Sequence, residues 1–111
     1  MEATLQSPPR QTMLEKSLVT IGQSPNNQLI VVDPDTSPYH AVLRSTEQGY
    51  TIMDLGSAHG TFVNGQRLAP NVHRLLQTGD QICIGDTMFI YEVCDGKATV
   101  FGQFITRESI Y

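Results

Sequence analysis

Three residues near the middle of the chain, Asp35, Ser37 and His40, combine side-chain types that can perform nucleophilic catalysis. The sequence has no G-x-S-x-G turn, no Walker loop, no glycine-rich nucleotide loop that opens a helix and no metal-binding motif. The closeness of Asp35, Ser37 and His40 in the sequence is explained by their shared position in a loop and does not require a catalytic role. A chain of 111 residues also leaves little volume for a water-excluding pocket. We therefore predict that the protein is not an enzyme.

Composition and charge exclude several other classes. The formal net charge is −4, and the seven Lys and Arg are scattered, so neither a nucleic-acid nor a membrane partner is expected. Cys83 and Cys94 lie in apolar runs, which favours two half-buried reduced thiols, with a disulfide between paired strands as the alternative. They have no C-x-x-C spacing and no histidine at ligand spacing in the sequence, so we predict no metal and no cofactor. Residues 1–10 lack the apolar stretch of a signal peptide, and no run approaches about 18 apolar residues, so a cytoplasmic location is expected.

Short runs rich in Val, Ile, Leu, Thr and Tyr alternate with turn residues, as expected for a sheet protein. This pattern predicts an all-β, two-sheet antiparallel sandwich. The sharpest turn signal is Asn64-Gly65, because both residues tolerate the positive φ angles of a type I′ hairpin turn. The predicted strands are 12–16, 18–21, 28–32, 41–45, 50–54, 61–63, 67–68, 81–84 and 88–93.

The two ends of the chain are assigned separately from the predicted domain, which spans residues 12–94. Residues 1–11 form an N-terminal segment in which Ala3–Gln6 is a possible first edge strand. Residues 95–111 form a C-terminal extension or linker, whose apolar residues could pack on the sandwich, add an edge strand or begin a linker.

Four motifs follow one another in the loops: LVTIGQSPNNQLIV at 18–31, SPYHA at 37–41, DLGSAHGTFVNG at 54–65 and GDQICIG at 79–85. Together, over about residues 12–93, they resemble the signature of the forkhead-associated (FHA) domain family. The resemblance implies a sandwich of about eleven strands whose loops at one end bind phosphothreonine peptides. It further implies a protein-interaction module whose partner is a phosphorylated protein or peptide.

The resemblance also assigns roles to individual residues. Ser37 matches the serine whose hydroxyl donates to the phosphate, and His40 matches a histidine that holds the loops in shape. The predicted phosphopeptide-binding residues are Gln23, Ser37, Pro38, Ser57, His59 and Thr61. The predicted scaffold residues are Gly22, His40, Gly60, Asn64 and Gly65.

Three positions depart from the family pattern. Gln23 stands where the family has an arginine, and losing one charge-assisted bond to phosphate costs about 1.5–3 kcal/mol. Pro38 brings no donor where members often carry Arg, Lys or Asn, and His59 replaces an asparagine that grips the peptide backbone. The sequence therefore predicts a phosphothreonine-dependent module with an atypical pocket. The alternative is a phosphate-independent interaction or self-association domain on the same fold.

Overall fold

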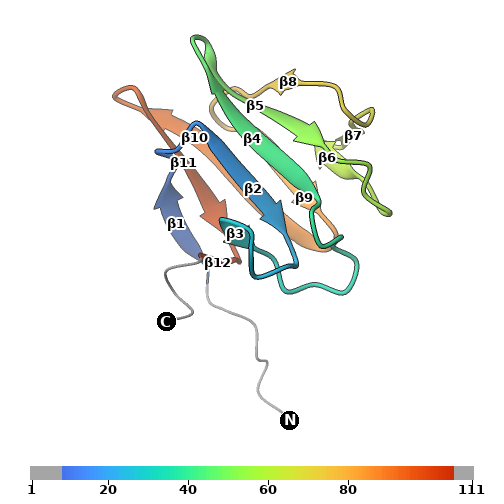
Figure 1. Ribbon diagram of the computed structural model, residues 1–111. Coiled ribbons are helices and arrows are strands. Elements are labelled where there is room, and N and C mark those ends of the chain that lie inside the picture. The colour runs from blue at the N-terminus through green and yellow to red at the C-terminus, as the bar shows by residue number, and fades with distance from the viewer. Residues whose placement is uncertain (1–8, 107–111) are drawn as a thin grey trace.

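The computed structural model describes residues 9–106, which form strands, turns and bends, arranged as two sheets packed face to face (Figure 1). No helix in this range has the length and apolar character of a membrane-spanning segment. The first sheet has the order β1-β11-β10-β9-β6-β7, with β1 Arg10–Met13, β6 Thr61–Val63, β7 Gln66–Arg67, β9 Gln81–Ile84, β10 Thr87–Cys94 and β11 Lys97–Gly102. The second has the order β12-β3-β2-β4-β5-β8, with β2 Leu18–Gly22, β3 Leu29–Ile30, β4 Ala41–Thr46, β5 Gly49–Asp54, β8 Arg74–Leu75 and β12 Ile105–Thr106.

The core lies between the sheets, because alternate residues of each strand face inward. On β10, for example, Phe89 and Tyr91 are buried whereas Met88 is exposed. The rings of Phe89 and Phe104 meet at a centroid distance of 5.7 Å. The predicted sandwich is confirmed. One pairing departs from the expected antiparallel arrangement, since β2 and β3 run parallel through two residue pairs.

Residues 97–102, which the sequence placed in an extension or linker, form β11 between β10 and β1. Its residues alternate, with Ala98 and Val100 buried and Phe101 exposed, so the segment belongs to the same sheet as the preceding hairpin. β1 is an edge strand of this sheet and begins two residues before the predicted domain start. The candidate strand 3–6 lies outside the described residues.

The Asn64-Gly65 turn has the predicted backbone geometry. Asn64 has φ of 51° and Gly65 has φ of 82°, and together they join β6 to β7. Asn64 also accepts a hydrogen bond from the Gln81 backbone N–H at 2.9 Å and donates one to the Asp80 carboxylate at 2.9 Å. These bonds tie the hairpin to the end of the molecule opposite the loops described below.

The outer face of the first sheet carries neutral, largely apolar residues in neighbouring positions. Phe62 lies opposite Cys83, which lies opposite Met88 on the next strand. Beside them Ile90 lies opposite Phe101, and we refer to these five residues together as the row. Met88 and Phe101 are 48% and 45% exposed, so this row is in contact with solvent.

Candidate functional site

Three loops meet at one end of the sandwich, where β2 ends, β4 begins and β5 ends (Figure 1). They are residues 23–28 between β2 and β3, residues 31–40 between β3 and β4, and residues 55–60 between β5 and β6. All the predicted phosphopeptide-binding residues lie in these loops, except Thr61, which begins β6. Because the loops extend from rigid strands, they can hold a ligand-binding geometry.

His40 connects the second and third loops from a fully buried position. Its Nδ1 accepts a hydrogen bond from the Ser37 backbone N–H at 3.1 Å, so Nδ1 carries no hydrogen. Nε2 therefore carries the hydrogen and donates it to the Gly60 carbonyl at 2.9 Å. These two bonds link the backbone on either side of the site, and they use both ring nitrogens.

Asp54, at the end of β5, organises the third loop. Its carboxylate accepts hydrogen bonds from the Ser57 and Thr61 hydroxyls, each at 2.6 Å. It also accepts backbone N–H bonds from Gly56 at 2.9 Å and Ser57 at 3.0 Å. Burial would raise the pKa of Asp54, but these four bonds favour the charged form and together lower its pKa below the usual value.

The role of Asp54 was not identified from the sequence, although the residue opens the third motif. The signal was present, because a strand-ending Asp followed by Ser at the third position can accept local turn bonds. The bonds to Asp54 engage the side chains of two residues that were predicted to bind the phosphopeptide. Thr61 is fully buried and its hydroxyl donates to Asp54, so within this structure its side chain supports the third loop. Ser57 likewise donates to Asp54 and accepts from the Gly60 N–H at 3.0 Å.

Ser37 is half-buried at the junction of the second and third loops. Its Oγ accepts a hydrogen bond from the Ala58 backbone N–H at 3.2 Å, which leaves the hydroxyl hydrogen available to donate. Its carbonyl accepts from the Gln23 backbone N–H at 3.0 Å. Gln23 and His40 thus fix the backbone of Ser37, and Ala58 positions its hydroxyl oxygen.

Gln23 braces the second loop with its side chain. Its Nε2 donates to the Asp33 carbonyl and to the Thr36 carbonyl, each at 3.0 Å. An amide has two hydrogens, so both donors are engaged within the protein. The sequence placed Gln23 among the phosphopeptide-binding residues, whereas in this structure its side-chain donors bind the backbone of the second loop.

Pro38 and Gly22 form a close contact that the sequence did not reveal. A Cβ on Gly22 would collide with the Pro38 carbonyl, so only glycine fits there. The Pro38 carbonyl also accepts a bond at 2.7 Å from the side chain of Asn27, which is fully buried and donates to the Ser24 carbonyl at 2.8 Å. Pro38 therefore acts through its carbonyl, and Asn27 is a scaffold residue missed by the motif comparison.

The charged groups around the loops are mainly acidic. His59 is exposed, and its Nε2 lies 3.7 Å from the Asp35 carboxylate. Arg67 of β7 places its side chain against Gly60, because its Nε lies 2.7 Å from the point that a Cβ on Gly60 would occupy. A guanidinium group is thus present beside the third loop, supplied by a residue well separated in sequence from the family's arginine position.

Tyr39 adds an exposed phenol to the rim of the second loop. Its hydroxyl accepts hydrogen bonds from the Asn26 amide at 3.2 Å and the Ser24 hydroxyl at 3.5 Å. These bonds, first from Asn26 and then from Ser24, lower the pKa of Tyr39. The first loop and the second loop therefore also meet at the surface.

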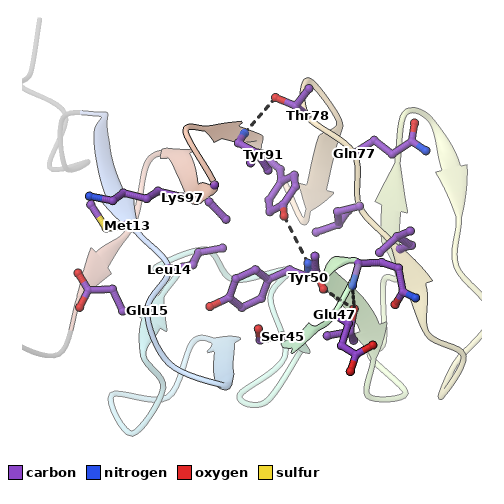
Figure 2. Close-up of a pocket in the computed structure, with 18 residues that line it drawn as sticks. Met13, Leu14, Glu15, Ser45, Glu47, Tyr50, Gln77, Thr78, Tyr91 and Lys97 are labelled. Carbon is purple, nitrogen blue, oxygen red and sulfur yellow. Dashed lines mark hydrogen bonds between the residues drawn. The ribbon is translucent and has the colours of Figure 1, made fainter.

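A separate hollow of about 780 Å³ lies at the opposite end of the sandwich (Figure 2). Leu14, Tyr50, Leu76 and Tyr91 form its buried wall, and the turns at 45–49 and 96–97 form its rim. None of the residues that the motifs single out lines it. The candidate phosphopeptide site and this hollow are thus distinct.

The sequence and the fold both match known FHA domains. The family model for the FHA domain matches residues 19–85, and the chain belongs to this family. An FHA domain is a module that supports phosphothreonine-dependent protein interaction in general.

Individual relatives agree with this assignment. The oxoglutarate dehydrogenase inhibitor of Corynebacterium efficiens is 33% identical over 79 residues, covering 71% of this chain and 54% of that protein. The chain thus spans about half the length of this relative. The NMR structure of the FHA-2 domain of the Mycobacterium tuberculosis ABC transporter Rv1747 is similar, with a TM-score of 0.61 and 32% identity. It covers 88% of this chain and 86% of that one.

A third comparison shows the fold alone. It is an FHA structure from a study of phosphothreonine-dependent FHA interactions, with a TM-score of 0.61 and 20% identity over 84% of this chain and 93% of that chain.

Proposed function

We propose that this domain binds phosphothreonine peptides at the loop end of the sandwich, with Ser37 as the phosphate donor and without the family's arginine. The proposal is supported mainly by the hydrogen bonding of Ser37. Its backbone is fixed by Gln23 and His40, and its Oγ is positioned by Ala58 while its hydrogen stays free. A donor fixed before the ligand arrives loses less freedom on binding.

The proposal includes a different source of positive charge. Both amide hydrogens of Gln23 are used within the loop, so its side chain serves the frame. The Arg67 side chain, which lies against Gly60, is the cationic group that the proposal places nearest to the third loop. A charged donor makes a hydrogen bond to phosphate roughly twice as strong as a neutral donor does.

The first test is a titration of the ¹⁵N-labelled chain with a degenerate phosphothreonine peptide pool and with its unphosphorylated twin. We expect phosphate-dependent shifts at Gln23, Thr36 and Ser37 and in residues 57–61. No phosphate-dependent shift at about millimolar peptide, where even weak binding is detectable, would contradict the proposal.

The matched substitution is Ser37→Ala. It removes one donor to a charged ligand, so we expect affinity for a selected phosphopeptide to fall by about tenfold or more. Ser17→Ala removes an exposed serine from the opposite end of the molecule and should leave affinity unchanged. Equal affinities in the two variants would exclude Ser37 as the phosphate donor.

A second function, phosphate-independent self-association, is favoured by the exposed row on the outer face of the first sheet. Phe62, Cys83, Met88, Ile90 and Phe101 carry no charge, and the exposed Arg67, opposite Phe62, lies at one edge of the row. Two copies of the chain could bury these five side chains against one another despite a net charge of −4.

Sedimentation velocity distinguishes this second function from the first. A dimer that Phe101→Glu dissociates, and that Val72→Glu preserves, would support it. Val72 is 54% exposed but lies outside the row, in the segment before β8. A monomer at all concentrations would exclude it.

A further inference from the structure

We propose that the loop end of this domain binds a divalent cation, with calcium as the best-fitting ion, between Asp33, Asp35 and Asp86. The first two residues lie in the β3–β4 loop, and the third lies in the turn between β9 and β10. One carboxylate oxygen from each can be chosen so that all three lie within 4.8 Å of one another. The proposal goes beyond phosphopeptide binding and can be tested without any peptide.

The cluster is held together by bonds to Asp33. Its Oδ1 accepts the Asp35 backbone N–H at 2.9 Å, and its Oδ2 accepts the Asp86 backbone N–H at 2.8 Å. Each bond uses one lone pair, so each oxygen keeps another for a cation. Asp33 is buried, whereas Asp35 and Asp86 are exposed and leave room for water to complete the coordination.

The charges of the cluster are poorly balanced. Three carboxylates this close repel one another, and a buried carboxylate is costly without a partner. Within residues 9–106 the ion pair found for these groups is the exposed His59–Asp35 contact at 3.7 Å. A divalent cation would offset the repulsion.

Thr36 provides an independent indication that a ligand fits here. Its side chain is 3% exposed, and its Oγ1 has no hydrogen-bond partner. Oγ1 lies 3.1 Å, and Asp33 Oδ2 lies 2.9 Å, from the point that a Cβ on Gly85 would occupy. The unpartnered hydroxyl and the carboxylate therefore face the same small gap, next to Asp86. Buried hydroxyls rarely stay unsatisfied, and a bound cation would accept a lone pair from this one.

The donor set selects the type of ion. Carboxylate and hydroxyl oxygens suit hard cations, whereas zinc sites are built mainly from Cys and His. Calcium binds oxygens at about 2.3–2.6 Å in flexible geometry, so oxygens separated by up to twice that distance can share one ion. Magnesium demands a stricter octahedron and holds its water more firmly. Calcium thus fits this irregular, partly exposed set better.

The cation would lie beside the candidate phosphate site. Gln23 Nε2 donates to the carbonyls of Asp33 and Thr36. The loop segment that this side chain holds therefore contains the proposed ligand Asp33 and directly precedes Ser37. A bound ion would bring positive charge to a rim that has lost the family's arginine. This consequence alone rests on the proposed function.

The test uses the full chain, freed of metal by chelation and titrated with CaCl₂ in a calorimeter and in thermal melts. We expect saturable one-to-one binding with a dissociation constant on the order of 10⁻⁴–10⁻³ M and a rise in melting temperature. The double variant Asp35→Asn/Asp86→Asn should weaken binding at least tenfold. Asp33 stays intact in this variant, because its carboxylate holds the two loops together.

Asp95→Asn is the matched control, since Asp95 is an exposed acid on the distant β10–β11 hairpin with φ of 55°, which asparagine tolerates. It should bind calcium as the unmodified chain does. Absence of saturable binding in the unmodified chain, or equal binding in the double variant and the control, would overturn the proposal. MgCl₂ titrated alone should bind more weakly, and equal binding of magnesium would refute the preference for calcium. No peptide is present, so failure here is separate from failure of phosphopeptide binding.

Discussion

The segments that connect the strands are stabilised differently at the two ends of the sandwich. At the loop end, buried polar side chains hold long irregular segments: His40 and Asn27 bond to the backbone of a neighbouring loop, and Asp54 bonds to the backbone of the loop that follows it. At the opposite end, short turns close the strands locally, as at Asn64-Gly65 and Asp95-Gly96, where all four residues have positive φ. Side-chain scaffolds cost more to build, because each buried polar group must be satisfied.

The end closed by short turns contains the hollow shown in Figure 2. The Tyr50 hydroxyl donates to the Lys16 carbonyl at 2.8 Å, and the Tyr91 hydroxyl accepts from the Tyr50 backbone N–H at 3.4 Å. Burial, followed by the nearby Tyr91, raises the pKa of Tyr50. Two tyrosines with bonded hydroxyls thus stand beside Leu14 and Leu76 in the wall. Preorganised donors are therefore concentrated at the loop end, where a charged ligand would need them.

The largest expected effect is on stability and comes from Asp54→Ala. This change leaves the donors of Ser57 and Thr61 and two backbone N–H groups without their acceptor, so we expect the free energy of unfolding to fall by about 3 kcal/mol or more. Urea denaturation measures it. Glu47→Ala, in the exposed β4–β5 turn, is the control and should change stability little. Similar losses in both variants would contradict the structural role assigned to Asp54.

The acid dependence of stability sharpens the same contrast. The pKa of Asp54 in the folded state is below its ordinary value of 3.8, so its contribution is complete at higher pH and is lost as the pH falls through that value toward the folded pKa. Urea midpoints measured from about pH 6 down to pH 2.5 should show this loss. Asp54→Asn should flatten the profile in the acid range. An unchanged profile in that variant would remove Asp54 as its source.

An intermediate effect is expected from Gln23→Arg. Arginine can still donate to the carbonyls of Asp33 and Thr36 and adds a charge beside Ser37, so phosphopeptide affinity should rise by about tenfold. Calorimetric titration gives the change. Gln77→Arg makes the same substitution at the opposite end, on the rim of the hollow, and should not alter affinity. An equal gain in both variants would reduce the effect to net charge.

The smallest effect is expected from Tyr50→Phe. Loss of the bond to the Lys16 carbonyl should lower the free energy of unfolding by about 1 kcal/mol without changing phosphopeptide affinity. Tyr39→Phe at the loop rim is the matched control, because its hydroxyl is exposed and its loss should hardly alter stability. The melting temperatures of the two variants distinguish them. A weakened phosphopeptide affinity in Tyr50→Phe would show that the two ends are coupled.

Local patterns in the sequence were sufficient for much of the architecture. Alternating apolar residues and turn signals located β2, β4, β5, β6, β9 and β10 to within a residue or so. Two-residue strands such as β8 and β12 have too few positions for alternation to be visible. The pairing of β11 with both β1 and β10 depends on contacts between distant segments, so the segment appeared only as an apolar tail.

For the candidate site, too, the sequence predicted some features and only the structure showed the others. The motifs indicated which loops to examine, but the partners of their side chains depend on packing. The motif comparison assigned Thr61 to phosphopeptide binding, whereas in the structure it is buried against Asp54. The proposed cation site was invisible, because Asp33 and Asp86 lie 53 positions apart and carry no metal-binding motif.

The sequence by itself determined most of the longer strands, the Asn64-Gly65 turn and the family, since φ preferences, alternation and loop motifs are properties of neighbouring residues. Only the tertiary structure decided where the polar hydrogens point. Gln23 turns its amide inward, Ser37 keeps its hydroxyl hydrogen free and Thr36 has no partner, because each hydrogen bond requires two groups that the folding of the sheets brings together.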